Sequence, residues 1–195
     1  MEAVRRWWLV LAVALLLAGP ALAGEPVVAS GQADGATPAW TLTARSPDGW
    51  TADCCTYARA IGVDAVVYRG EWSGEPQRVM VLNAWPAKLA SLDDELAADR
   101  SGYLRRDPAG RALTLPIAHP SMRCAANVYE GSDRIDDMVV FCDPGKASGI
   151  RFSWSMTLAA NDGQRRALLD ELLAVVRSTG YRRGATSLPA PAAKH

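Results

Sequence analysis

The sequence predicts an α+β fold: a largely antiparallel sheet with helices packed on both faces, an α/β/α sandwich. Residues 150–158 alternate polar and apolar side chains, the period-two pattern of a strand. The runs at 65–68 and 138–141 are apolar on both sides, as in strands covered on both faces. Residues 161–179 carry an apolar stripe at helical spacing, which supplies a helix to cover the sheet.

The sequence of residues 40–85 predicts a strand followed by a hairpin. Residues 40–44 alternate apolar and polar side chains, and Ser46–Gly49 supplies a turn before Trp50. Residues 64–72 and 78–85 are rich in strand-forming residues and are joined by a short Ser-Gly-Glu-Pro connection, so we expect antiparallel neighbours.

A helix is expected over residues 90–105. Leucines recur there near helical spacing, and Ser91 precedes Asp94 at the interval of a capping box. The acidic run of residues 93–95 then has a local explanation, because acids near the first turn complement the helix dipole.

The remainder predicts more strands and a closing helix. A short strand at 111–115 precedes a loop containing His119, and a hairpin joins 124–130 to 137–142. In the strand at 150–158, the side chains expected to face the core are Phe152, Trp154 and Met156. We expect Asn161 or Asp162 to cap the last helix, which should end at Thr179-Gly180.

Residues 1–23 are typical of a cleavable secretory signal. Arg5-Arg6 precedes an apolar run from Trp7 to Ala18, and Ala21-Leu22-Ala23 offers small residues before a cut after Ala23. Gly19-Pro20 ends the apolar run before it reaches the length of about twenty residues that a membrane-spanning helix needs. Residue 24 is glycine, so the cysteine that carries the lipid of a lipoprotein is missing at the expected place. We therefore expect a periplasmic or secreted protein with no stable membrane anchor after cleavage.

Composition predicts a single compact domain. We expect a flexible segment at 24–37, one globular domain at 38–183 and a flexible tail at 184–195, because both ends are rich in Ala, Gly, Ser or Pro. Acidic and basic residues balance at 21 each, so nothing favours a nucleic-acid partner.

The order of elements resembles the PsbP-like superfamily, bacterial envelope relatives of the photosystem accessory protein. The resemblance covers about residues 40–180 and rests on the aromatic Trp50 and on the order of elements. Asp48-Gly49-Trp50 follows a first strand, and then come a hairpin, the Leu92–Leu96 helix, further antiparallel strands and a closing amphipathic helix. It implies a binding or assembly module without a shared catalytic residue. The cysteines depart from the general pattern of the superfamily and would mark a subgroup.

The cysteines Cys54, Cys55, Cys124 and Cys142 are expected to form disulfides in an oxidising compartment. A hairpin centred at Asp133 would place Cys124 opposite Cys142, and the adjacent pair would then bond to each other. Two long-range pairings stay open. A thiol-redox or soft-metal role for the adjacent pair is an alternative, since rings between neighbours are more easily reduced.

No catalytic signature is found. His119 and His195 are the only histidines, which excludes a site of several histidines, and neither a metal nor a cofactor is expected. A small hydrolase that uses His119 with Ser121 or a carboxylate is an alternative, although no nucleophile-elbow motif surrounds that serine.

The sequence thus predicts a non-catalytic binding or accessory module, for envelope maintenance or immunity against a toxin. Its partner would be a protein or a small ligand. Trp72, beside Arg69 and Glu71 at the end of a predicted strand, is the candidate partner contact.

Overall fold

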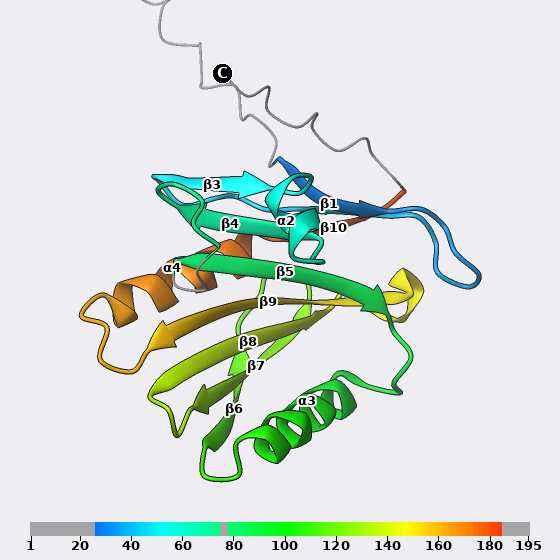
Figure 1. The fold of residues 1–195 in the computed structure, drawn as a ribbon. Coiled ribbons are helices and arrows are strands. Elements are labelled where there is room, and N and C mark those ends of the chain that lie inside the picture. Colours follow the sequence, from blue (N-terminus) through cyan, green and yellow to red (C-terminus); the bar gives the residue numbers. More distant parts are fainter. Residues whose placement is uncertain (1–25, 75–77, 185–195) are drawn as a thin grey trace, which may run out of the picture.

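The computed structural model describes residues 26–74 and 78–184, which form two antiparallel sheets (Figure 1). The smaller sheet has the order β1-β2-β10, and the larger has the order β3-β4-β5-β9-β8-β7-β6. The strands are β1 (Val27–Gly31), β2 (Trp40–Thr43), β3 (Trp50–Asp53), β4 (Ala65–Arg69), β5 (Val79–Pro86), β6 (Arg111–Ile117), β7 (Arg123–Glu130), β8 (Ile135–Asp143), β9 (Ile150–Ala159) and β10 (Gly180–Arg183). The helices are α2 (Tyr57–Ala60), α3 (Leu92–Arg106) and α4 (Arg165–Ser178), with a 3₁₀ turn η1 at Lys146–Ser148.

The predicted α+β class is confirmed, and helices cover both faces of the seven-stranded sheet. Alternate residues of β8 point to opposite faces. Val140 lies in register with Trp154 of β9 and packs in the core beneath α4, whereas Val139 and Phe141 pack with α3. The predicted core residues Phe152, Trp154 and Met156 are all buried, as the alternation of β9 requires.

The N-terminus of α3 has the predicted capping box. The Ser91 hydroxyl accepts the Asp94 N–H, and the Asp94 carboxylate accepts the Ser91 N–H. Leu92 and Leu96 are buried against Phe141, which holds the helix on the sheet.

Two polar contacts fix α3 further. Arg151 of β9 is only 4% exposed and its guanidinium bonds to Glu95 at 2.9 Å, to Asp143 at 3.2 Å and to the Leu89 carbonyl at 3.0 Å. Asn127 of β7, which is also buried, donates to the Leu96 carbonyl at 2.9 Å. These bonds set the position of α3 along the sheet, because buried polar groups need partners of fixed geometry.

The closing helix α4 begins later than expected. The predicted cap, Asn161 or Asp162, is wrong: α4 starts at Arg165 after Gln164, and no side chain caps it. The Asp162 carboxylate instead accepts the Gln164 N–H at 2.7 Å and pairs with Arg78 at 3.5 Å. It is engaged in the turn before the helix, so it is not available to the amides of the first helical turn.

The small sheet corrects the prediction of a single sheet and of a flexible segment at 24–37. β1 lies within that segment and pairs with one edge of β2, while β10 pairs with the other edge of β2. The folded part therefore begins before residue 38. The predicted leader at 1–23 with its cut after Ala23, and residues 185–195 of the predicted tail, lie outside the described residues.

Asp64, directly before β4, gives a prediction for stability against pH. Its carboxylate accepts the Ala84 N–H at 2.7 Å, but burial is the larger influence and raises the pKa of Asp64 above the ordinary 3.8. An acid with a raised pKa in the folded state makes the protein lose stability as pH rises from the unfolded to the folded pKa.

Asp64→Asn removes that cost and keeps an oxygen for Ala84. We expect a higher melting temperature at pH 7 and no gain once the pH falls below about 3.8, measured by calorimetry at both pH values. Asp170→Asn, at an exposed position of α4, is the control. A lower melting temperature of the Asp64 variant at pH 7 would contradict this account.

Candidate functional site

The face of the larger sheet that carries α3 also carries an aromatic cluster, formed by Tyr57 of α2, Tyr68 of β4 and Trp72 of the following loop. Trp72 stacks on Tyr57 with ring centroids 4.7 Å apart and meets Tyr68 edge-on at 5.5 Å. Ala58, Val66 and Val79 are buried beneath these rings. The cluster fixes the orientation of Trp72 at the surface, since ring pairs of this geometry attract beyond simple burial.

A hollow of about 150 Å³ lies beside the aromatic cluster. Its floor comes from β5 and β9, and its walls come from the loop of Trp72 and from Ile61, which follows α2 and is 48% exposed. The lining residues are Ile61, Trp72, Gly74, Val79, Val81, Ser155, Met156 and Thr157. Most of this lining is apolar, with the hydroxyls of β9 at one side, so the hollow can take up one small apolar group.

The turn between β3 and α2 positions one wall of the hollow. The Asp53 carboxylate accepts the backbone N–H groups of Thr56 at 3.1 Å, Tyr57 at 2.7 Å and Ala58 at 3.0 Å. Between Asp53 and these amides, a disulfide joins Cys54 to Cys55. The turn is thus closed both by hydrogen bonds and by a covalent bond directly before Tyr57.

Tyr68 of the cluster is uncharged at neutral pH. Burial raises the pKa of Tyr68, and the neighbouring Tyr57 and Asp53 raise it further, against an opposing hydrogen bond with Thr51. The Tyr68 hydroxyl therefore stays protonated, and the ring that Trp72 meets edge-on is uncharged.

A second, more polar depression of about 260 Å³ lies where the C-terminus of α3 meets the β7–β8 hairpin. Tyr103, Arg106, Asp107, Ser132, Asp133, Ile135 and Asp137 line it. Burial raises the pKa of Asp137, while the hydrogen bond from the Thr157 hydroxyl opposes this rise. Asp107 accepts the Ser132 N–H at 2.7 Å, so part of this polar lining serves the fold.

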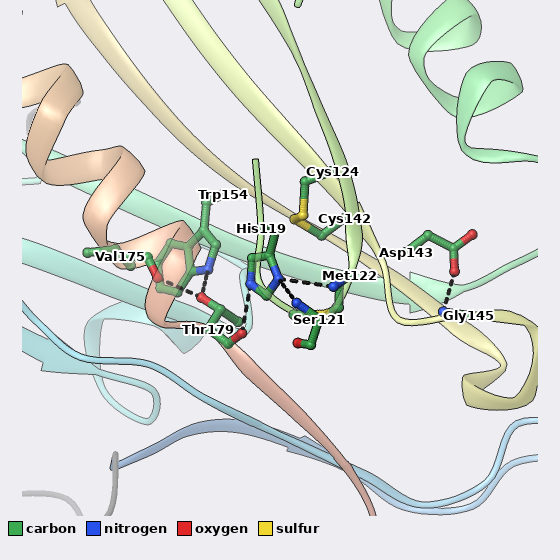
Figure 2. Close-up of a disulfide and its surroundings, with 10 residues drawn as sticks. All are labelled: His119, Ser121, Met122, Cys124, Cys142, Asp143, Gly145, Trp154, Val175 and Thr179. Carbon is green, nitrogen blue, oxygen red and sulfur yellow. Dashed lines mark hydrogen bonds between the residues drawn. A yellow bond between two sulfur atoms is a disulfide. The ribbon is translucent and has the colours of Figure 1, made fainter. Parts of the chain in front are cut away.

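His119 belongs to the β6–β7 connection, and its ring lies beside Thr179 at the end of α4 (Figure 2). Its Nδ1 accepts the backbone N–H groups of Ser121 and Met122, each at 3.1 Å, so Nε2 carries the hydrogen and donates to the Thr179 carbonyl at 3.1 Å. Both ring nitrogens are therefore bonded to the main chain. Ser121, the predicted partner, contacts the ring through its backbone amide.

The second disulfide joins Cys124 of β7 to Cys142 of β8, next to the His119 loop (Figure 2). The two residues are directly opposed in the ladder, with Cα atoms 4.2 Å apart, and both are buried. Of the three pairings left open by the sequence, the structure has Cys124–Cys142 with Cys54–Cys55. Two disulfides fit an extracellular or periplasmic protein.

Within residues 26–74 and 78–184, no group of three or more His, Cys, Asp or Glu side chains is arranged to hold a metal ion. In the same part of the chain, no helix is long and apolar enough to cross a membrane.

The chain is similar in structure to cyanobacterial PsbP. The solution structure of CyanoP from Synechocystis sp. PCC 6803 matches with a TM-score of 0.46 and 12% sequence identity, over 77% of this chain and 95% of that chain. No protein-family model and no curated protein matches the chain.

Trp72, the predicted partner contact, lines the apolar hollow, whereas His119, Cys124 and Cys142 do not. The Cys54–Cys55 bond lies in the turn that precedes the wall of the hollow. Sequence reasoning missed Ile61 and Tyr57, because α2 has only four residues and leaves no periodic signal. The adjacent cysteines were the one local sign that the turn before α2 is unusual.

Proposed function

We propose that this protein is a non-catalytic binding module that acts outside the cytoplasm, and that it binds a protein partner through one apolar side chain inserted beside Trp72. The observation that carries the proposal is the hollow itself, in which Trp72 and the half-exposed Ile61 form an apolar wall. Buried anchors of this kind supply most of the affinity in many interfaces. Envelope maintenance or immunity against a secreted toxin would use such a module.

The size of the hollow supports a side chain as its occupant. A volume of about 150 Å³ suits one aromatic or branched aliphatic group and is below the usual range for a drug-sized ligand. At its side, the Ser155 hydroxyl can bond to the main chain that presents the group, and the Thr157 oxygen, whose hydrogen goes to Asp137, can still accept.

The proposal predicts that Ile61→Ser weakens partner binding by about tenfold or more, because it removes apolar contact at the anchor. A photo-cross-linking amino acid at position 61 would trap the partner in cells, and the affinity would then be measured with both purified proteins. Leu113→Ser on β6 is a matched control, since Leu113 is 58% exposed and Ile61 is 48% exposed. Equal affinities for wild type and Ile61→Ser, or equal losses in both variants, would contradict the proposed site.

The absence of catalysis is tested separately. We expect His119→Ala to leave any background ester or peptide hydrolysis unchanged, since both ring nitrogens of His119 are engaged by the main chain. Turnover by the wild type that disappears in this variant would favour the hydrolase alternative instead.

The compartment is tested by the intact mass of protein isolated from the periplasm or medium. We expect a chain that starts at Gly24 and carries two disulfides. A retained leader would contradict the proposed secretion signal.

A further inference from the structure

The two disulfides differ in how an external thiol can reach them. Cys124 is 5% exposed and Cys142 is 0% exposed, and their bond links two inner strands of the large sheet. Cys54 and Cys55 are half-buried in the turn between β3 and α2, near the surface. Thiol–disulfide exchange requires a thiolate to approach a sulfur atom. Reduction of Cys54–Cys55 should therefore be faster than reduction of the buried Cys124–Cys142 bond.

The same turn sets the wall of the hollow. Cys55 is followed by the three residues whose amides bond to the Asp53 carboxylate, and the second of these amides belongs to Tyr57, on which Trp72 stacks. Ile61 closes this short segment and lines the hollow. An opening of the turn would move Tyr57 and Ile61, because α2 is only one helical turn long and cannot hold its position alone.

We propose that Cys54–Cys55 is a reversible dithiol–disulfide exchange site, and that its reduction displaces Tyr57 and Ile61 and dismantles the hollow. The regulatory part of this inference rests on the proposed function, since it assigns the oxidised protein as the binding form. The Cys124–Cys142 bond stays closed in both states and keeps the sheet intact.

The reaction needs a dithiol reductant, either a small dithiol or a dithiol oxidoreductase. Its thiolate attacks one sulfur of the pair, forming a mixed disulfide, and the other cysteine leaves as a thiolate that takes up a proton. The second thiol of the reductant attacks the mixed disulfide and releases the first cysteine. Two electrons pass to the protein, and the reductant ends as a disulfide.

The test treats the folded protein with dithiothreitol, alkylates the free thiols at intervals and maps them by mass spectrometry. We expect Cys54 and Cys55 to become labelled at least about a hundredfold faster than Cys124 and Cys142. Simultaneous labelling of all four cysteines, or labelling of the buried pair first, would overturn the proposal.

The structural consequence is read from methyl resonances in NMR spectra of the same samples. We expect the Ile61 methyl signals to shift on reduction and those of the buried Ile150 to stay in place. Cys54→Ser/Cys55→Ser should reproduce the reduced positions and be insensitive to dithiothreitol. Reduction of the pair with unchanged Ile61 signals would also overturn the proposal.

Indole, the side-chain group of tryptophan, serves as the apolar probe of the hollow. We expect it to shift the Ile61 signals of the oxidised protein and to bind the reduced form about tenfold more weakly or worse. If indole does not shift the signals of the oxidised protein, the proposed binding site is wrong. The proposed exchange at Cys54–Cys55 is still tested by the thiol labelling and by the Ile61 shift on reduction. Equal binding of indole in both states would overturn the redox control.

Discussion

Replacing Arg151 with methionine is expected to lower the free energy of unfolding by about 3–5 kcal/mol. The guanidinium is the shared partner of Glu95 and Asp143, and its side chain is 5% exposed while those of the two acids are 13% and 22% exposed. Methionine fills much of the space but leaves two partly buried carboxylates without the guanidinium that bonds to both. Burial of an unpaired charge is among the largest single destabilising effects known in proteins.

The measurement is urea denaturation, combined with amide hydrogen exchange over α3. We expect the amides of α3 to lose protection first, because Arg151 ties Glu95 of α3 and the Leu89 carbonyl just before it to the sheet.

Arg123→Met is the matched control. Arg123 also joins α3 to the sheet, through Asp93 at 2.7 Å, but both side chains are more than half exposed, at 61% and 68%. We expect a much smaller loss than for Arg151→Met, since water and salt screen such an exposed pair. Similar decreases in the free energy of unfolding for the two variants would contradict the idea that burial makes the Arg151 contacts important.

The second large effect is expected from Cys124→Ala/Cys142→Ala, which should lower the free energy of unfolding by about 3 kcal/mol. The bond closes a loop with a sequence separation of 18, so its removal gives the unfolded chain more freedom. The two sulfur atoms also leave the buried core, where both residues lie with Val140 and Trp154.

Urea denaturation of the oxidised proteins measures this effect. Cys54→Ser/Cys55→Ser is the comparison, because a ring between adjacent residues restrains little of the unfolded chain. Its loss, together with the loosened packing of Tyr57 and Ile61, should cost clearly less than the loss of the cross-strand bond. A stability equal to wild type in the Cys124/Cys142 variant would contradict the role given to the cross-strand bond.

The long regular elements could be predicted from the sequence because each has a local cause. The alternation along β9 and the Ser91–Asp94 capping box are both properties of neighbouring residues. The structure has the capping box and buries Phe152, Trp154 and Met156, although Arg151 and Ser153 on the other face of β9 are buried too. The β1-β2-β10 sheet could not be predicted in this way. The pairing of β10 with β2 joins the two ends of the domain, and β1, although close to β2 in the chain, contains Ala, Ser and Gly, which give no strand signal.

The site was only partly predictable for the same reason. Trp72 was identified because it is a tryptophan at the end of a predicted strand, but the hollow depends on how α2 folds back over β4 and β5. That arrangement is set by Asp53 and by long-range packing on Val66 and Val79, neither of which a periodic pattern reports. Cys124–Cys142 was favoured because the hairpin has a local turn, which the register confirms.

The position of β2 between β1 and β10 has a consequence for how the protein is made. Thr41 bonds to Gly184, 143 positions away, so β2 cannot complete its pairing until almost all of the domain has left the ribosome. During synthesis or export, one edge of this strand stays open, with backbone groups that can pair with other chains. High contact order of this kind slows folding, so a holding chaperone should raise the yield more than a faster rate of synthesis would.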